Sequence, residues 1–270
     1  MGKDFLKIIV EHKKKELEVL KKKRPEALLR LKSQDKREIR PFYENLKKPA
    51  EIKSGKTKPD KINIIAEIKR ASPSKGNICL NLDPGKIARD YEKGGARAIS
   101  VLTDEKFFKG SIDDFILARK ATRLPLLRKD FIISTYQVYE SFVSGADAIL
   151  LITKILSQEK LKELLALTHE LKMSALVEIN SKKDFQKADD AGARLIGINN
   201  RNLNSFDTDI TTAARLISLF SKDQTAVAAS GISGKEDINK ICKSGIFNFL
   251  IGESIVKADN PVTFLKSLIE

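Results

Sequence analysis

The residues best suited to chemistry lie in segment 64–76, an apolar run that ends in acidic, basic and hydroxyl side chains. Side chains alternate along a strand, so Glu67 and Lys69 are expected on the same side. Residues 72–76, which begin with Ser72, have turn chemistry that can lay amides and hydroxyls around an anion. The segment is typical of either an active-site rim or the solvated end of an edge strand.

The elements that must position these side chains recur every 20 to 30 residues after about residue 62, as strand-like runs each followed by a helical pattern. The predicted strands span residues 63–71, 98–103, 124–130, 148–153, 174–179, 195–199, 225–230 and 247–252. The predicted helices span residues 83–93, 111–121, 135–144, 157–171, 181–191, 209–220, 235–243 and 261–269. This alternation predicts an α/β fold, a closed (β/α)8 TIM barrel, rather than an open sheet.

Residues 1–61 are predicted to be a basic helical N-terminal extension, and residues 62–270 the barrel catalytic domain. Apolar spacing predicts an amphipathic helix over residues 3–24, and Pro25 permits a second helix over about residues 26–32. The apolar stripe of the first helix must be buried against something, and the barrel mouth is the expected place. We expect the barrel's own helices to complete a core without this extension.

The formal net charge of +14 is concentrated in the extension. Residues 1–61 hold 20 Lys and Arg against 10 Asp and Glu, whereas the remaining 209 residues hold 30 against 26. Aromatic interleaving and known nucleic-acid motifs are missing. A solvated lysine-rich helix face therefore explains the charge better than an RNA-binding patch, and we expect no specific nucleic-acid partner.

Composition also narrows the class of protein. At 41% apolar residues the 270-residue chain can bury a sizeable core. Cys79 and Cys242 have neither disulfide-framework nor metal-ligand spacing, and the longest apolar runs are too short to span a membrane. We expect a cytoplasmic protein that acts without a membrane, as a monomer or weak homodimer, with no cofactor and no metal.

Barrel enzymes gather their active sites at the carboxyl ends of the strands. The polar residues at the predicted strand ends are Glu67, Lys69, Lys129, Glu178, Asn199, Arg201, Ser230 and Glu253. Converging lysines, carboxylates, an amide and an arginine suit general acid–base chemistry on a multiply anionic substrate. His12 and His169 lie in predicted helices, so neither a metal site nor a Ser-His-Asp arrangement can be assembled from them.

The ends of the seventh and eighth predicted strands are typical of phosphate binding. Gly231 and Gly252 follow these strands, where glycine lets backbone N–H groups approach an oxyanion and a following helix adds its dipole. The alternative is that both glycines merely form tight turns. Their position in the two loops that barrels use for this purpose favours a phosphorylated small-molecule substrate.

These motifs resemble the indole-3-glycerol phosphate synthase family. The matching stretches, which cover essentially the whole barrel, are residues 65–74, 101–111, 128–132, 145–152, 177–180, 197–203, 230–232 and 250–253. Residues 8–19 are similar to the family's extra helices, which lie over the barrel mouth. The resemblance implies a carboxy-lyase of tryptophan biosynthesis that converts 1-(2-carboxyphenylamino)-1-deoxyribulose 5-phosphate into indole-3-glycerol phosphate, carbon dioxide and water.

The resemblance also implies roles for individual residues. Lys129 corresponds to the general acid of ring closure, while Lys69, Glu67 and Glu178 are candidates for the acid and base of dehydration. The implied substrate-binding residues are Arg70 on the ring carboxylate; Phe108, Phe131, Leu150 and Leu203 around the ring; Asn199 and Glu178 on the sugar hydroxyls and amine; and Arg201, Lys69, Ser230, Gly231, Gly252 and Glu253 at the phosphate end. Ser72 is also implied to bind substrate. Each apolar residue of this set is equally compatible with ordinary core packing.

One departure and two alternatives accompany this reading. The family usually has Glu where this chain has Ala229, which removes a negative charge from the mouth. A phosphoribosylanthranilate isomerase-like barrel would bind phosphate at the same two loops but is expected to use a cysteine and an aspartate as its acid–base pair. Cys79 and Cys242 lie away from the predicted strand ends, which argues against this alternative. A non-catalytic basic binding module would have no reason to retain Lys129 and Glu178.

Overall fold

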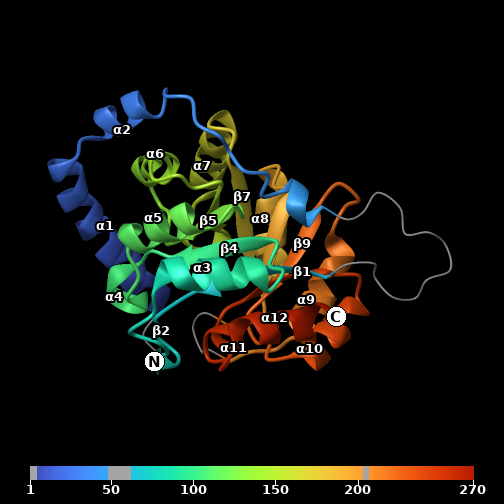
Figure 1. Cartoon of the computed structure of the whole chain (residues 1–270). Helices are drawn as coiled ribbons and strands as arrows, with labels where there is room; N and C mark the ends of the chain where they lie inside the picture. Colours follow the sequence, from blue (N-terminus) through green and yellow to red (C-terminus); the bar gives the residue numbers. More distant parts are fainter. Residues whose placement is uncertain (1–4, 48–61, 203–206) are drawn as a thin grey trace.

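The computed structural model describes residues 5–47, 62–202 and 207–270. Eight parallel strands close into a barrel in the order β1-β10-β9-β8-β7-β6-β5-β4 (Figure 1). They are β1 (Asn63–Ile68), β4 (Ala98–Leu102), β5 (Leu126–Lys129), β6 (Ala148–Ile152), β7 (Ser174–Ile179), β8 (Leu195–Asn199), β9 (Thr225–Ala229) and β10 (Asn248–Ile251). The predicted TIM barrel is therefore confirmed.

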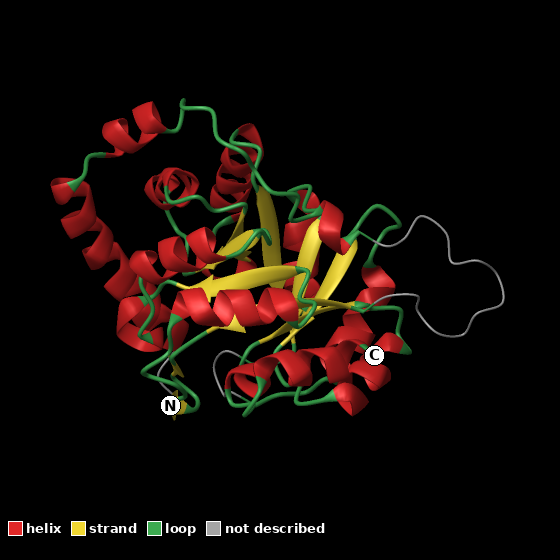
Figure 2. Cartoon of the chain, viewed as in Figure 1, coloured by secondary structure: helices red, strands yellow, loops and turns green. Residues whose placement is uncertain are grey.

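Helices surround the barrel, as the colouring by secondary structure shows (Figure 2). The outer helices are α3 (Pro84–Lys93), α5 (Ile112–Ala121), α6 (Thr135–Val143), α7 (Gln158–Glu170), α8 (Lys182–Asp190), α9 (Thr211–Leu216), α10 (Lys235–Cys242) and α12 (Pro261–Ile269). Several begin at a hydroxyl or carboxylate cap: Ser111, Ser157 and Ser181 accept from the backbone N–H three residues on. Local sequence thus sets where these helices start.

The loops contain short helices and strands that sequence periodicity did not predict. They are the hairpin β2 (Ala71–Ser72) and β3 (Gly76–Asn77), the one-turn helices α4 (Glu105–Phe108) and α11 (Glu253–Val256), and the 3₁₀ turns η1 (Glu44–Leu46), η2 (Thr153–Ile155) and η3 (Ile217–Leu219). The hairpin, α4 and α11 all follow the carboxyl ends of strands. They therefore add side chains to the barrel mouth.

The N-terminal extension begins with α1 (Phe5–Lys23) and α2 (Glu26–Lys32) and contributes to the core inside the barrel. Leu6 and Ile9 of α1 pack with inward-facing strand residues at the mouth, and Phe42 and Leu46 join the same apolar cluster. Phe42 and Leu46 are fully buried. The core between the strands and the outer helices, by contrast, takes all its buried residues from residues 62–270, as expected for a core that the barrel's own helices complete.

The segment after α2 crosses the outside of the barrel to the end opposite the mouth (Figure 1). Arg40 donates its backbone N–H to Asp147 Oδ1 at 2.8 Å and its guanidinium to the Leu124 carbonyl at 2.8 Å. The Asn45 amide reaches the Arg97 carbonyl, just before β4, at 3.1 Å. These contacts tie the extension to the starts of strands, at the end of the barrel opposite α1.

Within the described residues, no helix has the length and apolar character needed to cross a bilayer.

Candidate active site

A cavity of about 390 Å³ opens where the strands end, a size that suits a small-molecule ligand. Most residues predicted for the site line it: Glu67, Lys69, Ser72, Phe108, Lys129, Phe131, Glu178, Asn199, Arg201, Ser230, Gly231, Gly252 and Glu253. They come from the ends of β1, β4, β5, β7, β8, β9 and β10 or from the loops after them. The closed barrel therefore brings together residues that lie up to 186 positions apart in the chain.

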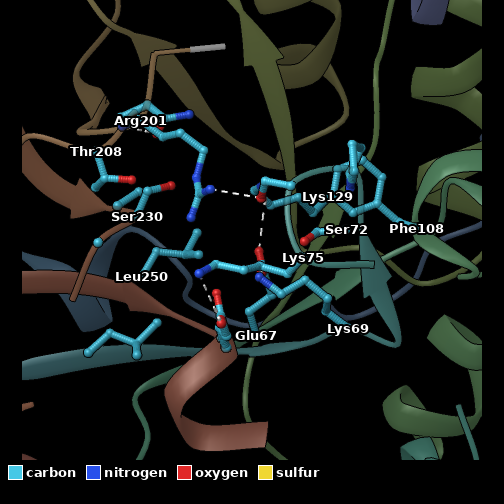
Figure 3. Close-up of a pocket in the computed structure, with 18 of the residues that line it drawn as sticks. Glu67, Lys69, Ser72, Lys75, Phe108, Lys129, Arg201, Thr208, Ser230 and Leu250 are labelled. Carbon is cyan, nitrogen blue, oxygen red and sulfur yellow. Dashed lines mark hydrogen bonds and ion pairs between the residues drawn. The ribbon is translucent and has the colours of Figure 1, made fainter. Parts of the chain in front are cut away.

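Glu67, Lys69 and Lys129 form a group of charges that we call the mouth cluster (Figure 3). Lys69 Nζ lies 2.8 Å from Glu67 Oε1, and Lys129 Nζ lies 3.7 Å from Glu67 Oε2. Glu67 is buried, and burial alone would raise the pKa of its carboxyl. The charges of Lys69 and Lys129 outweigh burial, so the pKa of Glu67 is lowered and the group is held as an anion.

Glu178, at the end of β7, behaves in the opposite way. Its buried carboxylate accepts a hydrogen bond from Asn199 Nδ2 at 3.1 Å. Burial raises the pKa of Glu178, and neither the charge of Lys129 nor the Asn199 hydrogen bond offsets it. The cavity thus holds two carboxylates that differ in their tendency to take up a proton, a common arrangement in acid–base sites.

The loops after β9 and β10 form the polar end of the cavity. Gly231 has φ of +74°, and a Cβ added there would lie 2.1 Å from Thr208 Cγ2. A Cβ added at Gly252 would lie 2.6 Å from Glu67 Oε1. Both positions need glycine, because a side chain would either strain the turn or displace the mouth cluster. Gly252 also begins helix α11, so its N–H groups are available to an anion.

Arg201 extends from the end of β8 towards this polar end. Its guanidinium donates to Ser74 Oγ at 2.7 Å, and its backbone N–H donates to Asn199 Oδ1 at 3.0 Å. Figure 3 shows Arg201, Thr208 and Ser230 gathered on one side of the cavity, with Phe108 on the opposite side. The loop containing Ser74 therefore joins the polar end through Arg201.

The opposite side of the cavity is apolar. Phe108 and Phe131 pack with their ring centroids 6.0 Å apart, and Phe5, Leu6 and Ile9 of α1 line the same cavity. Leu6, Ile9 and Phe131 belong to one buried apolar cluster that Phe108 also contacts. This side can accept a flat aromatic group.

The charges lining the cavity favour an anion. The cationic side chains are Lys69, Lys75, Lys129, Arg201 and Lys257, and the carboxylates are Glu67, Glu178 and Glu253. Glu253 is itself paired with Lys257 Nζ at 2.8 Å. A surplus of positive charge in a concave, partly apolar space raises the local concentration of anionic ligands.

Two of the predicted site residues that the structure describes, Arg70 and Leu150, do not line the cavity. Arg70 forms a bidentate ion pair with Asp114 on α5, with one contact at 3.0 Å. The expected contact between Arg70 and a ring carboxylate is therefore not preformed. Leu150 lies in the barrel interior and is 2% exposed, which makes it core rather than pocket wall. Leu203 lies outside the described residues.

Several lining residues escaped sequence reasoning. Phe5, Leu6 and Ile9 were not named as lining residues, but they line the cavity because α1 docks over it, which confirms the mouth as the place where its apolar stripe is buried. Lys75 lay within the anion-binding turn noted in the sequence, so its composition was a usable signal. Thr208 gave no such signal, because its place beside Arg201 and Gly231 depends on an isolated bridge and on packing between loops.

Comparison with known proteins yields a consistent result. A family model described as indole-3-glycerol phosphate synthase matches residues 6–268. The protein of that name from Desulfosudis oleivorans is 51% identical over 266 residues, covering 98% of each chain. The one from Syntrophobacter fumaroxidans is 46% identical over 265 residues, covering 98% of this chain and 97% of the relative.

Solved structures of lower sequence similarity share the fold alone. A 3-hexulose-6-phosphate synthase from Salmonella typhimurium superposes with a TM-score of 0.61 at 12% identity, over 77% of this chain and 96% of its own. A thiamine phosphate pyrophosphorylase from Pyrococcus furiosus gives 0.59 at 14% identity, over 77% and 93%. Both confirm the barrel and are too distant in sequence to assign chemistry.

Proposed function

This chain belongs to the indole-3-glycerol phosphate synthase family, and from that premise we propose how its own residues carry out the reaction. The enzyme is a carboxy-lyase that closes, decarboxylates and dehydrates 1-(2-carboxyphenylamino)-1-deoxyribulose 5-phosphate. The observation that carries the residue assignments is the polarity of the cavity, which is basic and glycine-lined at one end and aromatic at the other. The substrate has the same polarity.

The substrate's phosphate is assigned to the glycine end. Backbone N–H groups after Ser230 and Gly252, with the hydroxyls and cations around them, suit a dianion at the start of α11. The carboxylate of Glu253 is occupied by Lys257, so a ligand there would be held by backbone groups. The anthranilate ring is assigned to Phe108 and Phe131 at the other end.

Ring closure joins a ring carbon to the ribulose carbonyl carbon, and negative charge develops on the carbonyl oxygen. A positioned cation that donates a proton to this oxygen lowers the energy of the transition state for ring closure. We assign this role to Lys129, which ends β5 between the two ends of the cavity and is 19% exposed. Glu67, held as an anion, lies 3.7 Å from Lys129 Nζ and helps to orient it.

Loss of carbon dioxide then breaks the bond between the ring and its carboxylate. That loss restores the aromaticity of the benzene ring. Dehydration follows, and it needs an acid for the leaving hydroxyl and a base for the ring proton whose removal completes the indole. Lys69, Glu67 and Glu178 are the candidates for these two roles. The opposite pKa shifts of Glu67 and Glu178 make them separable by their pH–rate profiles.

The other readings fit the site less well. An isomerase that needs a cysteine would find none here, because neither Cys79 nor Cys242 is among the described residues that line the cavity. A purely basic binding module gives no reason for two buried carboxylates of opposite pKa shift. We further propose that the protein acts in the cytoplasm without a specific nucleic-acid or membrane partner, as a monomer or weak homodimer.

The decisive experiment mixes the purified protein with the carboxyphenylamino-deoxyribulose phosphate and follows the fluorescence of the indole product. We expect turnover at nanomolar enzyme, competitively inhibited by inorganic phosphate. Absence of product at micromolar enzyme would remove the proposed activity. Turnover that tens of millimolar phosphate leaves unchanged would instead contradict only the phosphate assignment.

A further inference from the structure

Helix α1 has a lysine where its periodicity calls for an apolar residue. The buried residues of the helix are Leu6, Ile9, Lys13 and Leu17, one stripe at helical spacing. Lys13 is only 1% exposed. A charge buried to this extent is costly unless it is paired, so its partners indicate why it is there.

The ammonium of Lys13 meets three carboxylates. Lys13 Nζ lies 3.0 Å from Asp130 Oδ1, 3.1 Å from Asp104 Oδ2 and 2.9 Å from Glu16 Oε2. Burial lowers the pKa of Lys13, but the combined effect of Asp130, Asp104 and Glu16 outweighs it and raises the pKa. Lys13 is therefore charged in the folded protein.

Asp130 connects this charge to the mouth, because it directly follows Lys129 in the chain. The Asp130 carboxylate accepts the Phe131 backbone N–H at 2.8 Å and the Thr103 hydroxyl at 2.7 Å. It also pairs with Arg128, the residue before Lys129, at 3.0 Å. One carboxylate thus bonds the Arg128 side chain before Lys129 and the Phe131 backbone after it.

Asp104 connects the same charge to the aromatic end of the cavity. Its Oδ1 accepts the Phe107 backbone N–H at 2.8 Å and so caps α4, the short helix that carries Phe108. Its Oδ2 faces Lys13. One buried ammonium therefore joins α1, the Phe108 helix and the end of β5.

We propose that Lys13 is a positioning residue for ring closure, which sets the aromatic pocket and the Lys129 side chain relative to each other. The proposal rests on the role assigned to Lys129 above. Lys13 is not among the described residues that line the cavity, so it acts through Asp104 and Asp130. Displacing reacting groups by as little as about 1 Å can cost two orders of magnitude in rate.

The test is Lys13→Met, which keeps the apolar stem and removes the charge. We expect kcat, from indole fluorescence, to fall on the order of ten- to a hundred-fold. Affinity for inorganic phosphate, measured by its thermal protection, should change less than about twofold, because its site lies at the other end of the cavity. Lys15→Met, on the exposed face of the same helix, should leave both quantities unchanged.

A second control separates positioning from general destabilisation. Leu17→Ala removes a buried side chain of the same stripe that packs against Leu29 and Tyr136, away from the cavity. It should lower the melting temperature and leave kcat intact at 25 °C. If Leu17→Ala lowers kcat as much as Lys13→Met does, or if Lys13→Met keeps kcat within twofold of wild type, the positioning role is wrong.

Should Lys13→Met not fold, Asp104→Asn tests the same link. Asparagine keeps the acceptor that caps α4 but loses the charge facing Lys13. We expect a kcat reduction of roughly threefold or more without loss of phosphate affinity. An unchanged kcat in this variant would overturn the proposal, whereas an inactive wild type would overturn the proposed function instead.

Discussion

Two groups of buried charge lie at the same end of this barrel, and they differ in how completely their charges are satisfied. In the Lys13 cluster, made of Lys13, Asp104, Arg128 and Asp130, side chains are at most 4% exposed and cations and carboxylates meet at 3.0 to 3.1 Å. Glu16, the third carboxylate beside Lys13, lies outside this cluster and is 31% exposed. In the mouth cluster, Lys69 and Lys129 are 15% and 19% exposed, and the Lys129 pair is 3.7 Å long.

The difference indicates that the Lys13 cluster maintains a fixed geometry, whereas the mouth cluster can rearrange when a ligand binds. A buried charge whose partners are all in place stabilises a geometry, and removing one partner is costly. Charges left with an open side and a long contact can receive a ligand and move a proton. Chemistry needs the second kind of cluster, and it is held in place by the first.

The largest expected effect comes from removing a charge from the Lys13 cluster. Asp130→Asn leaves Lys13 and Arg128 buried with one carboxylate fewer, and we expect it to lower the free energy of unfolding by about 3 to 5 kcal/mol. Urea denaturation followed by circular dichroism measures this. Asp259→Asn, at an exposed position, is the control and should change stability by less than about 0.5 kcal/mol. Equal stability of the two variants would remove the distinction between the clusters.

Removing a charge from the mouth cluster should lower activity rather than stability. Lys129→Met deletes the proposed proton donor, and we expect kcat to fall about a hundredfold or more while the melting temperature changes little. Lys120→Met, on the outer helix α5, should retain wild-type kcat and serves as the control. Near-wild-type turnover in Lys129→Met would mean that another group donates the proton.

Sequence reasoning succeeded where a residue's position follows from local pattern. The bounds of β7 and β8 were predicted without error, because each strand has a short apolar run, over residues 175–177 and 195–198, that leads into a polar residue, Glu178 or Asn199. Their carboxyl ends then placed Glu178 and Asn199 at the mouth. The six other predicted strands were one to three residues too long, because their ends were placed beyond the residues that the structure pairs.

It failed where the position depends on contacts distant in the chain. Strand alternation puts Arg70 on the opposite side from Glu67 and Lys69, a signal that was available, but its capture by Asp114 is a tertiary contact. The four-residue helix α4 is too short to show a period. Lys13 looked like one of many solvated lysines, because only docking of α1 shows that it is buried.

The two clusters should also respond differently to acid. The pKa of Asp130 is lowered, because Lys13 and Arg128 outweigh burial, so its stabilising effect is full above the unfolded pKa of about 4 and is lost as pH falls below it. Stability of the wild type, from denaturation at successive pH values, should therefore fall below about pH 4. Asp130→Asn should show a shallower fall. Parallel curves for the two proteins would contradict this assignment.

The smallest expected effect has the opposite sign and concerns Glu178. Because burial raises its pKa, the folded protein binds its proton more tightly than the unfolded chain, and the ionised carboxylate costs stability at neutral pH. This cost is relieved as pH falls through the raised pKa. Glu178→Gln keeps an acceptor for Asn199 and removes the charge, so we expect it to stabilise the protein by about 1 kcal/mol at pH 7.

The same substitution should lower kcat more than it raises KM, because the buried carboxylate is kept for chemistry at the expense of stability. Thermal melting at pH 7 and pH 5 with steady-state kinetics tests both halves, and Glu170→Gln, an exposed position on α7, is the control. The stability gain should shrink at pH 5, where more of the wild-type carboxyl is protonated than at pH 7. If Glu178→Gln is less stable than wild type and fully active, Glu178 has a structural role like that of the Lys13 cluster and no role in the reaction.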